Sequence, residues 1–217
     1  MKKIKPKKTV KAKRLSFPDD EKDHPWLSTL LEAFYIVDSG VAGAIEAEIK
    51  KGRNLACVKG CPNCCSTHRD IPVYPLELVG ISWYVTEKMT GHERETLRDQ
   101  LENFDKQGPC PFLIEGVCSI HKVRPLACRQ FNVFRRPCDR GEDPYYTRRE
   151  DVLEPVREHV DQAFFIMLPF YGVEKETDRT RAVERGDMHK IARVMQDCNW
   201  KSLAEMMDKY DDKQKKH

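Results

Sequence analysis

The sequence predicts a mainly α-helical protein, a single helical domain with irregular, cysteine-rich loops at its centre. Apolar residues recur at helical spacing over most of the chain, and neither an alternating strand pattern nor a glycine-rich phosphate loop is present. Eight of the nine cysteines fall between Cys57 and Cys138. With 217 residues, 40% of them hydrophobic, the chain can bury one core. We expect an arm over residues 1–20, a helical domain over 21–210 and a metal-binding core over about 55–140.

The first residues form a basic arm. Residues 1–14 contain eight Lys or Arg and no acidic residue, although the net charge of the whole chain is only +3, so the rest of the chain is mildly acidic. A polar, lysine-rich segment without apolar periodicity is expected to be disordered, here over residues 1–20. It acts either as a solvated tail that aids solubility or, through residues 1–14, as a contact for nucleic acid or an anionic surface.

Two helices, each recognised by a stripe of apolar residues at helical spacing, are expected before the first cysteine. Behind Pro25, a favourable first helical residue, apolar residues recur as far as Val37, and Gly40 is expected to end this helix. A second stripe over residues 41–49 is expected to end at Gly52, since glycine suits the left-handed cap of a helix.

Two helices of about equal length are expected over residues 75–90 and 92–106, between the cysteine-bearing segments. An antiparallel pair of equal helices returns the chain to the end from which it left. We therefore expect Cys110 to lie beside Cys65, so that one site is assembled from segments distant in sequence.

No signal for export or membrane insertion is recognised in the sequence. The longest nearly apolar run, Ala163 to Val173, has 11 residues, which is about half of the ~20 that a spanning helix needs. The basic start is not followed by the apolar core of a signal peptide. We therefore expect a cytoplasmic protein with no membrane span. Because thiols stay reduced in that compartment, the cysteines are expected to bind metal or to do redox chemistry rather than to form disulfides.

The run Cys57-x3-Cys61-x2-Cys64 places three thiolates within reach of one polynuclear metal centre, because two or three residues span the distance between its corners. Cys65 follows directly, and the side chains of adjacent residues point apart. One of this pair is therefore expected to serve a second metal or a different edge of a cluster, or to stay a free thiol.

Four later cysteines complete the candidate ligand set. Cys110 lies before a proline that stiffens its loop, although it could also be an exposed turn residue. Cys118 and Cys128 have apolar neighbours that would equally suit ordinary buried thiols. Cys138 is either a ligand or a free surface thiol. The expected metal ligands are Cys57, Cys61, Cys64, Cys65, Cys110, Cys118, Cys128 and Cys138.

Two arginines, Arg124 and Arg129, are candidate cofactor-binding residues. Guanidinium groups beside a negatively charged metal centre lower thiol pKa values and stabilise the metallated form, and the alternative is a solvated basic face. Cys198 is remote from the other cysteines and is expected to be structural. His68 and His121 are weaker ligand candidates, because isolated histidines are more often surface or core residues.

Three blocks resemble the CxxCxxCC-type, or YkgJ-like, cysteine-cluster proteins, a family described as zinc- or iron-chelating. The blocks are residues 57–65, Cys110-Pro-Phe-Leu and residues 118–129, in that order. The first gap has three residues rather than the family's two, and His121 stands where the family commonly has tyrosine. The resemblance implies metal chelation through these cysteines. It leaves the reaction open, although flagellin lysine-N-methylase shares the cysteine signature and indicates that enzymes occur among the relatives.

Two functions follow as hypotheses. The first is an iron-sulfur protein with a [4Fe-4S] cluster, acting with a redox or protein partner in electron transfer or supporting an enzymatic step. The alternative is a zinc-binding module with one or two structural four-cysteine sites that mediates contact with nucleic acid or protein. Two zinc sites would normally show two Cys-x2-Cys pairs, and this sequence has one. A radical S-adenosylmethionine enzyme is disfavoured because no alternating strand-helix pattern follows the cysteines. Whether the protein is an enzyme stays open.

Overall fold

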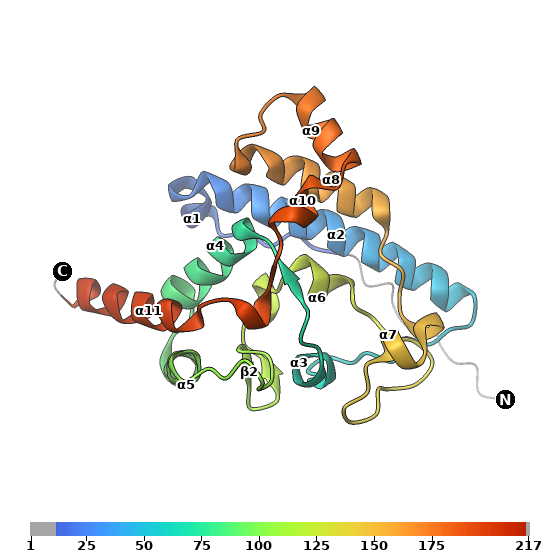
Figure 1. Ribbon diagram of the computed structural model, residues 1–217, viewed down its shortest axis with the longest axis horizontal. Helices are drawn as coiled ribbons and strands as arrows, with labels where there is room; N and C mark the ends of the chain where they lie inside the picture. Colours follow the sequence, from blue (N-terminus) through green and yellow to red (C-terminus); the bar gives the residue numbers. More distant parts are fainter. Residues whose placement is uncertain (1–11, 216–217) are drawn as a thin grey trace.

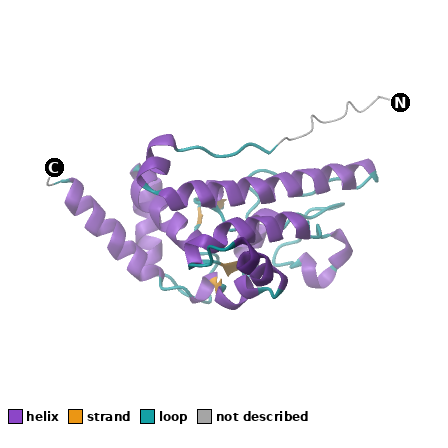
Figure 2. Ribbon diagram, turned by 90° about the horizontal axis from the view of Figure 1, so that it is seen from above, coloured by secondary structure: helices purple, strands orange, loops and turns teal. Residues whose placement is uncertain are grey.

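Helices account for most of the computed structural model, which describes residues 12–215 (Figure 2). The α-helices are α1 (Pro18–Asp23), α2 (Pro25–Lys50), α3 (Asn63–Thr67), α4 (Pro75–Trp83), α5 (Gly91–Glu102), α6 (Leu126–Gln130), α7 (Pro144–Thr147), α8 (Arg157–Met167), α9 (Glu176–Glu184), α10 (Asp187–Ile191) and α11 (Trp200–Gln214). A π-helical turn, η1 (Tyr84–Lys88), follows α4, and the 3-10 turns are η2 (His121–Val123), η3 (Arg149–Asp151), η4 (Leu168–Tyr171) and η5 (Met195–Asp197). Two short antiparallel pairs join β1 (Pro72–Val73) to β4 (Arg193–Val194) and β2 (Leu113–Ile114) to β3 (Val117–Cys118). The expectation of a mainly α, single-domain fold is confirmed.

Helix α2 is the centre of the fold, with α8 packed along one side and α4 and α6 on others (Figure 1). It begins at Pro25 and runs for 26 residues, and Gly52 turns the chain beyond its end with a φ of +86°. Its fully buried side chains include Leu27, Leu30, Leu31 and Phe34. By length and composition alone, α2 is also the one helix among the described residues that could cross a membrane. In this fold its apolar face forms the middle of the hydrophobic core.

The expected helix end at Gly40 is wrong, because α2 continues without a break to Lys50. A Cβ atom added at Gly40 would lie 2.6 Å from Cγ of His159, a residue of α8. Glycine is therefore required here by the close approach of two helices and not by a turn. The two expected stripes form one helix, and the expected left-handed glycine at Gly52, beyond its end, is confirmed.

The expected pair of matched helices between the cysteine segments is only partly realised. The first is helical throughout, as α4 followed by η1, whereas the second, α5, is shorter than expected. In place of a self-contained pair, α5 packs chiefly against the C-terminal helix α11, which also contacts η1. The predicted consequence is nevertheless confirmed, because the amide of Cys110 donates a hydrogen bond to the carbonyl of Cys65 (2.7 Å).

The expected basic arm is only partly within the described residues, since residues 1–11 lie outside them. Residues 12–17 lead into α1, which packs against α2. Arg14 forms ion pairs with Glu21 (2.8 Å) and with Glu32 of α2 (3.0 Å). The folded part of the chain therefore begins before the expected boundary at residue 20.

The cysteines are less confined to loops than the sequence suggests. Cys64 and Cys65 lie on α3, Cys118 lies on β3 and Cys128 lies on α6. Helices α3 and α6 each have five residues and each follows a proline. Helices this short show no apolar periodicity, so the sequence pattern missed them. In Figure 1, α3, α6 and α7 lie below α2, while α8 and α9 lie above it.

Candidate metal centre

Four thiols from four segments form what we call the inner thiol group: Cys65 of α3, Cys110 of the loop after α5, Cys118 of β3 and Cys128 of α6. The Cys65 thiol is at its centre, because it interacts with the thiols of Cys110 and Cys118, and it also interacts with the neighbouring Cys64 thiol. Cys128 lies close enough to shift the pKa of both of these. The structure thus brings together thiols that lie up to 63 residues apart in the sequence.

Burial and mutual repulsion oppose ionisation of much of the inner thiol group. Burial raises the pKa of the Cys128 thiol, and neighbouring thiols raise it further. The pKa of Cys110 is raised by its interaction with Cys65 and then by burial. Cys65 and Cys118 have lowered pKa values, because Cys65 is hydrogen-bonded by Cys110 and Cys118 is hydrogen-bonded by Cys65. A metal cation would favour the thiolate form of all four, because its charge offsets their repulsion.

A cavity of about 30 Å³ lies against the inner thiol group. Its lining consists of Cys64, Cys65, His68, Ile71, Cys110, Cys128, Phe131, Met195 and Gln196. The thioether sulfur of Met195 lies 3.8 Å from Sγ of Cys110. Most of the lining is sulfur and hydrocarbon, so the site has the low polarity that limits access of water to a metal-thiolate centre.

The outer thiol group consists of Cys57, Cys61 and Cys138. Burial raises the pKa of Cys138 to about 11, and the charges of Cys57 and Cys61 also act on it. Cys61 is exposed, whereas the other two are half-buried. The amide of Val133 donates a hydrogen bond to Sγ of Cys57 (3.3 Å). This group therefore lies nearer the surface than the inner one.

Cys64 stands between the two groups. Its pKa is raised first by its interaction with Cys65 and then by burial. Its charge acts on Cys57 of the outer group and on Cys128 of the inner group. Because Cys64 and Cys65 are consecutive on α3, their side chains leave the helix about 100° apart. Their two thiols nevertheless interact with each other and line the same cavity.

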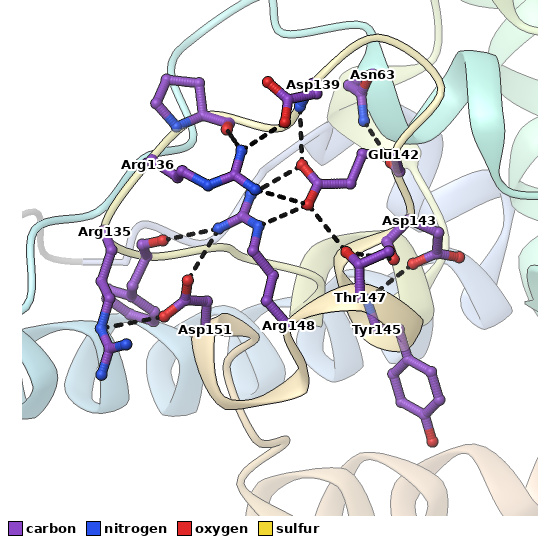
Figure 3. A network of polar contacts seen from close by, with 12 residues as sticks. Asn63, Arg135, Arg136, Asp139, Glu142, Asp143, Tyr145, Thr147, Arg148 and Asp151 are labelled. Atoms are coloured by element: carbon purple, nitrogen blue, oxygen red, sulfur yellow. Dashed lines mark hydrogen bonds and ion pairs between the residues drawn. The ribbon is translucent and has the colours of Figure 1, made fainter.

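Ion pairs hold the loop that carries Cys138 (Figure 3). At their centre is Arg148, whose Nε lies 2.9 Å from Oε1 of Glu142 and whose Nη1 lies 3.1 Å from Oδ2 of Asp151. Arg136, two residues before Cys138, also pairs with Glu142 (3.2 Å). The Arg148 hydrogen bond lowers the pKa of Glu142 to about 2, so this carboxylate stays charged at neutral pH.

Two residues of this network reach the outer thiol group, and the sequence analysis singled out neither. Nδ2 of Asn63 donates to the carbonyl of Glu142 (2.9 Å), which ties the start of α3 to the Cys138 loop. The charge of Arg148 lowers the pKa of Cys57 and of Cys138. An asparagine between two cysteines was the only local signal, because Arg148 lies ten residues beyond Cys138 and outside every cysteine block.

Glu77 is a further residue that the sequence analysis missed, and it positions Cys128. This fully buried carboxylate accepts hydrogen bonds from the amide of Leu126 at Oε1 (2.7 Å) and from the amide of Tyr74 at Oε2 (2.8 Å). It thereby joins the first turn of α4 to the first turn of α6, on which Cys128 lies. Burial raises the pKa of Glu77 to about 7, although these two donors and Arg129 oppose the shift. The pattern that could have identified Glu77 from the sequence is an acidic residue in the first turn of an apolar helix.

The two arginines expected at the metal centre occupy different positions. The charge of Arg124 lowers the pKa of Cys118 and of Cys128, so Arg124 lies near the inner thiol group. Arg129 is engaged elsewhere: its Nη1 lies 2.7 Å from Oδ2 of Asp38, and its other nitrogens donate to backbone carbonyls of the preceding turn. Arg129 therefore fastens α6 to α2, and each of its three guanidinium nitrogens already has a partner within the protein.

Two of the weaker candidates lie apart from the thiol groups. Sγ of Cys198 donates to the carbonyl of Val194 (3.5 Å), which agrees with a structural cysteine. The ring of His121 is adjacent to Arg124, and burial followed by this positive charge lowers the pKa of His121 to about 4. Neither residue lines the cavity beside the inner thiol group.

His68 departs from the expectation of a surface or satisfied core histidine. Its ring is buried, lines the cavity and packs edge-on against Phe131, with 4.5 Å between the ring centroids. Nδ1 lies 3.3 Å from Oδ2 of Asp143 without the alignment of a hydrogen bond, and Nε2 has no hydrogen-bond partner within the described residues. His68 therefore adds an unpaired polar group to the inner site.

The donor set fits a zinc or iron centre. Thiolates are preferred ligands of both zinc and iron-sulfur clusters, and the inner thiol group supplies the four that either centre takes. Across residues 12–215, no three Cys, His, Asp or Glu side chains are arranged so that they could already hold a metal ion. Metal binding therefore requires the thiols to move closer to their ligand positions.

Comparison with known proteins identifies the cysteine-bearing part of the chain. Residues 56–154, a little under half of the chain, match the model of the CxxCxxCC family, described as "Putative zinc- or iron-chelating domain". No curated protein and no solved structure matched the chain. The matched segment contains both thiol groups, Glu77 and Arg148, and it excludes Cys198. Residues 56–154 are therefore similar to the CxxCxxCC family of putative zinc- or iron-chelating domains.

Proposed function

We propose that this is a cytoplasmic iron-sulfur protein whose inner thiol group holds a [4Fe-4S] cluster for electron transfer. The observation that carries the proposal is the convergence of four thiols from separate segments, three of which, Cys65, Cys110 and Cys128, line one apolar cavity. Four cysteines are the usual ligand set of such a cluster. The ligands would be Cys65, Cys110, Cys118 and Cys128.

Two features favour a cluster over a single zinc ion in the inner thiol group. A zinc ion needs four thiolates around one point, each about 2.3 Å from the metal, and among the described residues no three donors approach that arrangement. A cluster spreads its ligands over separate corners and is stabilised by surroundings that limit access of water. Ile71, Phe131 and Met195 supply such surroundings.

When bound, a [4Fe-4S] cluster accepts and releases one electron. The chain's own residues set the conditions for this. Arg124 places positive charge near the thiolates, and His68 offers an unpaired ring nitrogen beside them. Positive charge and hydrogen bonds near the sulfur atoms stabilise the more negative, reduced form. The inner thiols are half-buried and not sealed, which keeps the centre within reach of a redox partner.

Anaerobic purification of the full chain tests the proposal. The protein should be brown, with broad absorption near ~400 nm, and should contain about four iron and about four sulfide per chain. Dithionite should bleach the colour. The Cys198→Ser variant serves as the control and should match the wild type. A colourless protein that holds stoichiometric zinc and no acid-labile sulfide, even after anaerobic reconstitution, would refute the iron-sulfur function.

A further inference from the structure

We propose that residues 193–200 form a clamp that holds the Cys110 thiol in place and covers the cavity beside it. Within this clamp, Gln196 is a positioning residue for Cys110, and Met195 is the cover of its thiol. The clamp lies wholly outside residues 56–154, the segment that matches the family model. The inference concerns the place of one thiol and not the identity of a metal, so it does not depend on the iron-sulfur function.

The first part of the clamp is joined to the chain that follows α3. In Figure 1 the clamp lies in the red segment between α10 and α11. Its strand β4 pairs antiparallel with β1, and Val194 lies opposite Pro72. The amide of Met195 then donates a hydrogen bond to the carbonyl of Ile71 (2.9 Å). Ile71 comes six residues after Cys65, so the clamp is attached to the short connection that leaves the cysteine-bearing helix α3.

The second part of the clamp is joined to the loop that carries Cys110. Nε2 of Gln196 donates a hydrogen bond to the carbonyl of Gly108 (3.1 Å) and a longer one to that of Pro109 (3.4 Å). Gln196 is buried, with 6% of its surface exposed. Because a buried amide group favours the position in which it is hydrogen-bonded, these bonds fix the backbone just before Cys110. The clamp therefore ties the Cys110 loop to the connection that follows α3.

Met195 covers the Cys110 thiol from the side of the clamp. The two sulfur atoms lie 3.8 Å apart, Met195 is buried, and both residues line the cavity. The carbonyl of Met195 accepts a hydrogen bond from Nε1 of Trp200 (2.9 Å). The Trp200 ring packs edge-on against Phe112, with 4.8 Å between the ring centroids. Since Phe112 follows Cys110 by two residues, the clamp contacts the loop on both sides of this cysteine in the sequence.

Cys128 provides an internal comparison for the effect of the clamp. It lines the same cavity as Cys110, but it lies on α6. That helix is held by hydrogen bonds to Glu77 and by the ion pair of Arg129 with Asp38, and none of these contacts involves the clamp. Loosening the clamp should therefore free the Cys110 thiol and leave the Cys128 thiol as protected as before.

Alkylation of the full chain by N-ethylmaleimide tests the clamp, with the rate at each cysteine measured by mass spectrometry under anaerobic, non-denaturing conditions. We expect Gln196→Ala to raise the rate at Cys110 at least about tenfold, because the loop opens more often without its hydrogen bonds. The rate at Cys128 should change by less than about twofold. The matched control is Asp197→Ala, since this neighbouring side chain forms an exposed ion pair with Lys106 (3.2 Å) and should not affect either rate.

Two substitutions at Met195 test its action as a cover. Met195→Leu conserves the volume of the side chain and should keep the Cys110 rate near that of the wild type. Met195→Ala removes the cover and should raise this rate roughly fivefold or more. Gly40→Ala, which disturbs the contact of α2 with α8, is the control for general instability and should change the rates at Cys110 and Cys128 by the same factor.

Three results would overturn the clamp. The first is a wild-type rate at Cys110 in Gln196→Ala, and the second is an equal rise at Cys110 and Cys128 in that variant. The third is a rise in Met195→Leu as large as that in Met195→Ala. Failure of the iron-sulfur function would look different, because the purified wild type would then hold zinc and no sulfide. The comparison of alkylation rates would still stand, since each variant is compared with a wild type that carries the same metal.

Discussion

The inner and outer thiol groups use the same kind of residue but are held in place in different ways. The inner group is anchored through the hydrophobic core, by the buried carboxylate of Glu77 and by the hydrogen bond from Cys110 to Cys65. The outer group depends instead on ion pairs around Arg148. The difference indicates that the inner group is fixed mainly by the packed core, whereas the position of the outer group depends more on charge pairs.

The largest expected effect that separates the two groups is that of Glu77→Ala. It leaves the amides of Tyr74 and Leu126 buried without acceptors, at roughly 1–3 kcal/mol each, and opens a cavity. We expect the free energy of unfolding to fall by about 4 kcal/mol and bound iron to decrease, because α6 no longer holds Cys128 in place.

Urea denaturation and metal analysis measure both effects. Glu93→Ala, which removes an exposed glutamate of α5, is the matched control and should change the free energy of unfolding by less than about 0.5 kcal/mol. An iron content in Glu77→Ala equal to that of the wild type would show that this carboxylate does not position the inner group.

A pH titration of stability should show the cost of burying the same carboxyl group. Its pKa is about 7 in the folded protein against an ordinary 4.5, so the folded state binds a proton that the unfolded state has released over this range. The stability due to this group is therefore present at low pH and is lost as the pH rises through 7. Between about pH 5.5 and about pH 8, the wild type should lose about 2 kcal/mol more than Glu77→Gln. If the free energies of unfolding of the two proteins changed with pH in parallel, the raised pKa of the buried Glu77 carboxyl group would be contradicted.

Arg148→Ala should act on the outer group alone. Glu142 and Asp151 would lose their nearly buried partner, at a cost of about 1–2 kcal/mol, and amide hydrogen exchange should speed up over residues 135–148. Iron content should stay unchanged. Arg136→Ala is the control, because this arginine pairs with the same glutamate from an exposed position and should cost less than about 0.5 kcal/mol. Loss of iron in Arg148→Ala would mean that the two groups are not held independently.

The smallest effect separates metal loss from general instability. Gly40→Ala forces a contact with His159 and should lower the free energy of unfolding by about 1 kcal/mol. At Gly43 of the same helix an added Cβ meets nothing within 4 Å, so Gly43→Ala should instead stabilise the protein by up to about 1 kcal/mol. Thermal melting and metal analysis measure the result, and both variants should keep their iron. Metal loss in Gly40→Ala would show that any loss of stability empties the sites.

Sequence patterns could predict what depends on local chemistry. Apolar periodicity predicted the main helices, and cysteine spacing predicted the metal-chelating domain that the family match supports. The return of Cys110 to Cys65 was also predicted, because it needs only that two helices lead away and back.

The remaining features depend on contacts between distant residues. Gly40 was predicted to end a helix, because the sequence alone does not show that it packs against His159 of another helix. The direction in which the Arg129 side chain points depends on its ion pair with Asp38 of α2. The positions of Cys64 and Cys65 relative to the two groups depend on a helix of five residues, which is too short to leave a periodic signal.

The most direct test of the central claim is the iron and sulfide content of Cys128→Ser beside Cys138→Ser, both purified without oxygen from cells supplied with iron. The first variant removes the most deeply buried thiol of the inner group, and the second removes a thiol of the outer group. We predict that Cys128→Ser loses at least about nine-tenths of its iron and sulfide, while Cys138→Ser keeps both at the wild-type level. Full iron and sulfide in Cys128→Ser, or equal loss in both variants, would contradict an iron-sulfur centre in the inner thiol group.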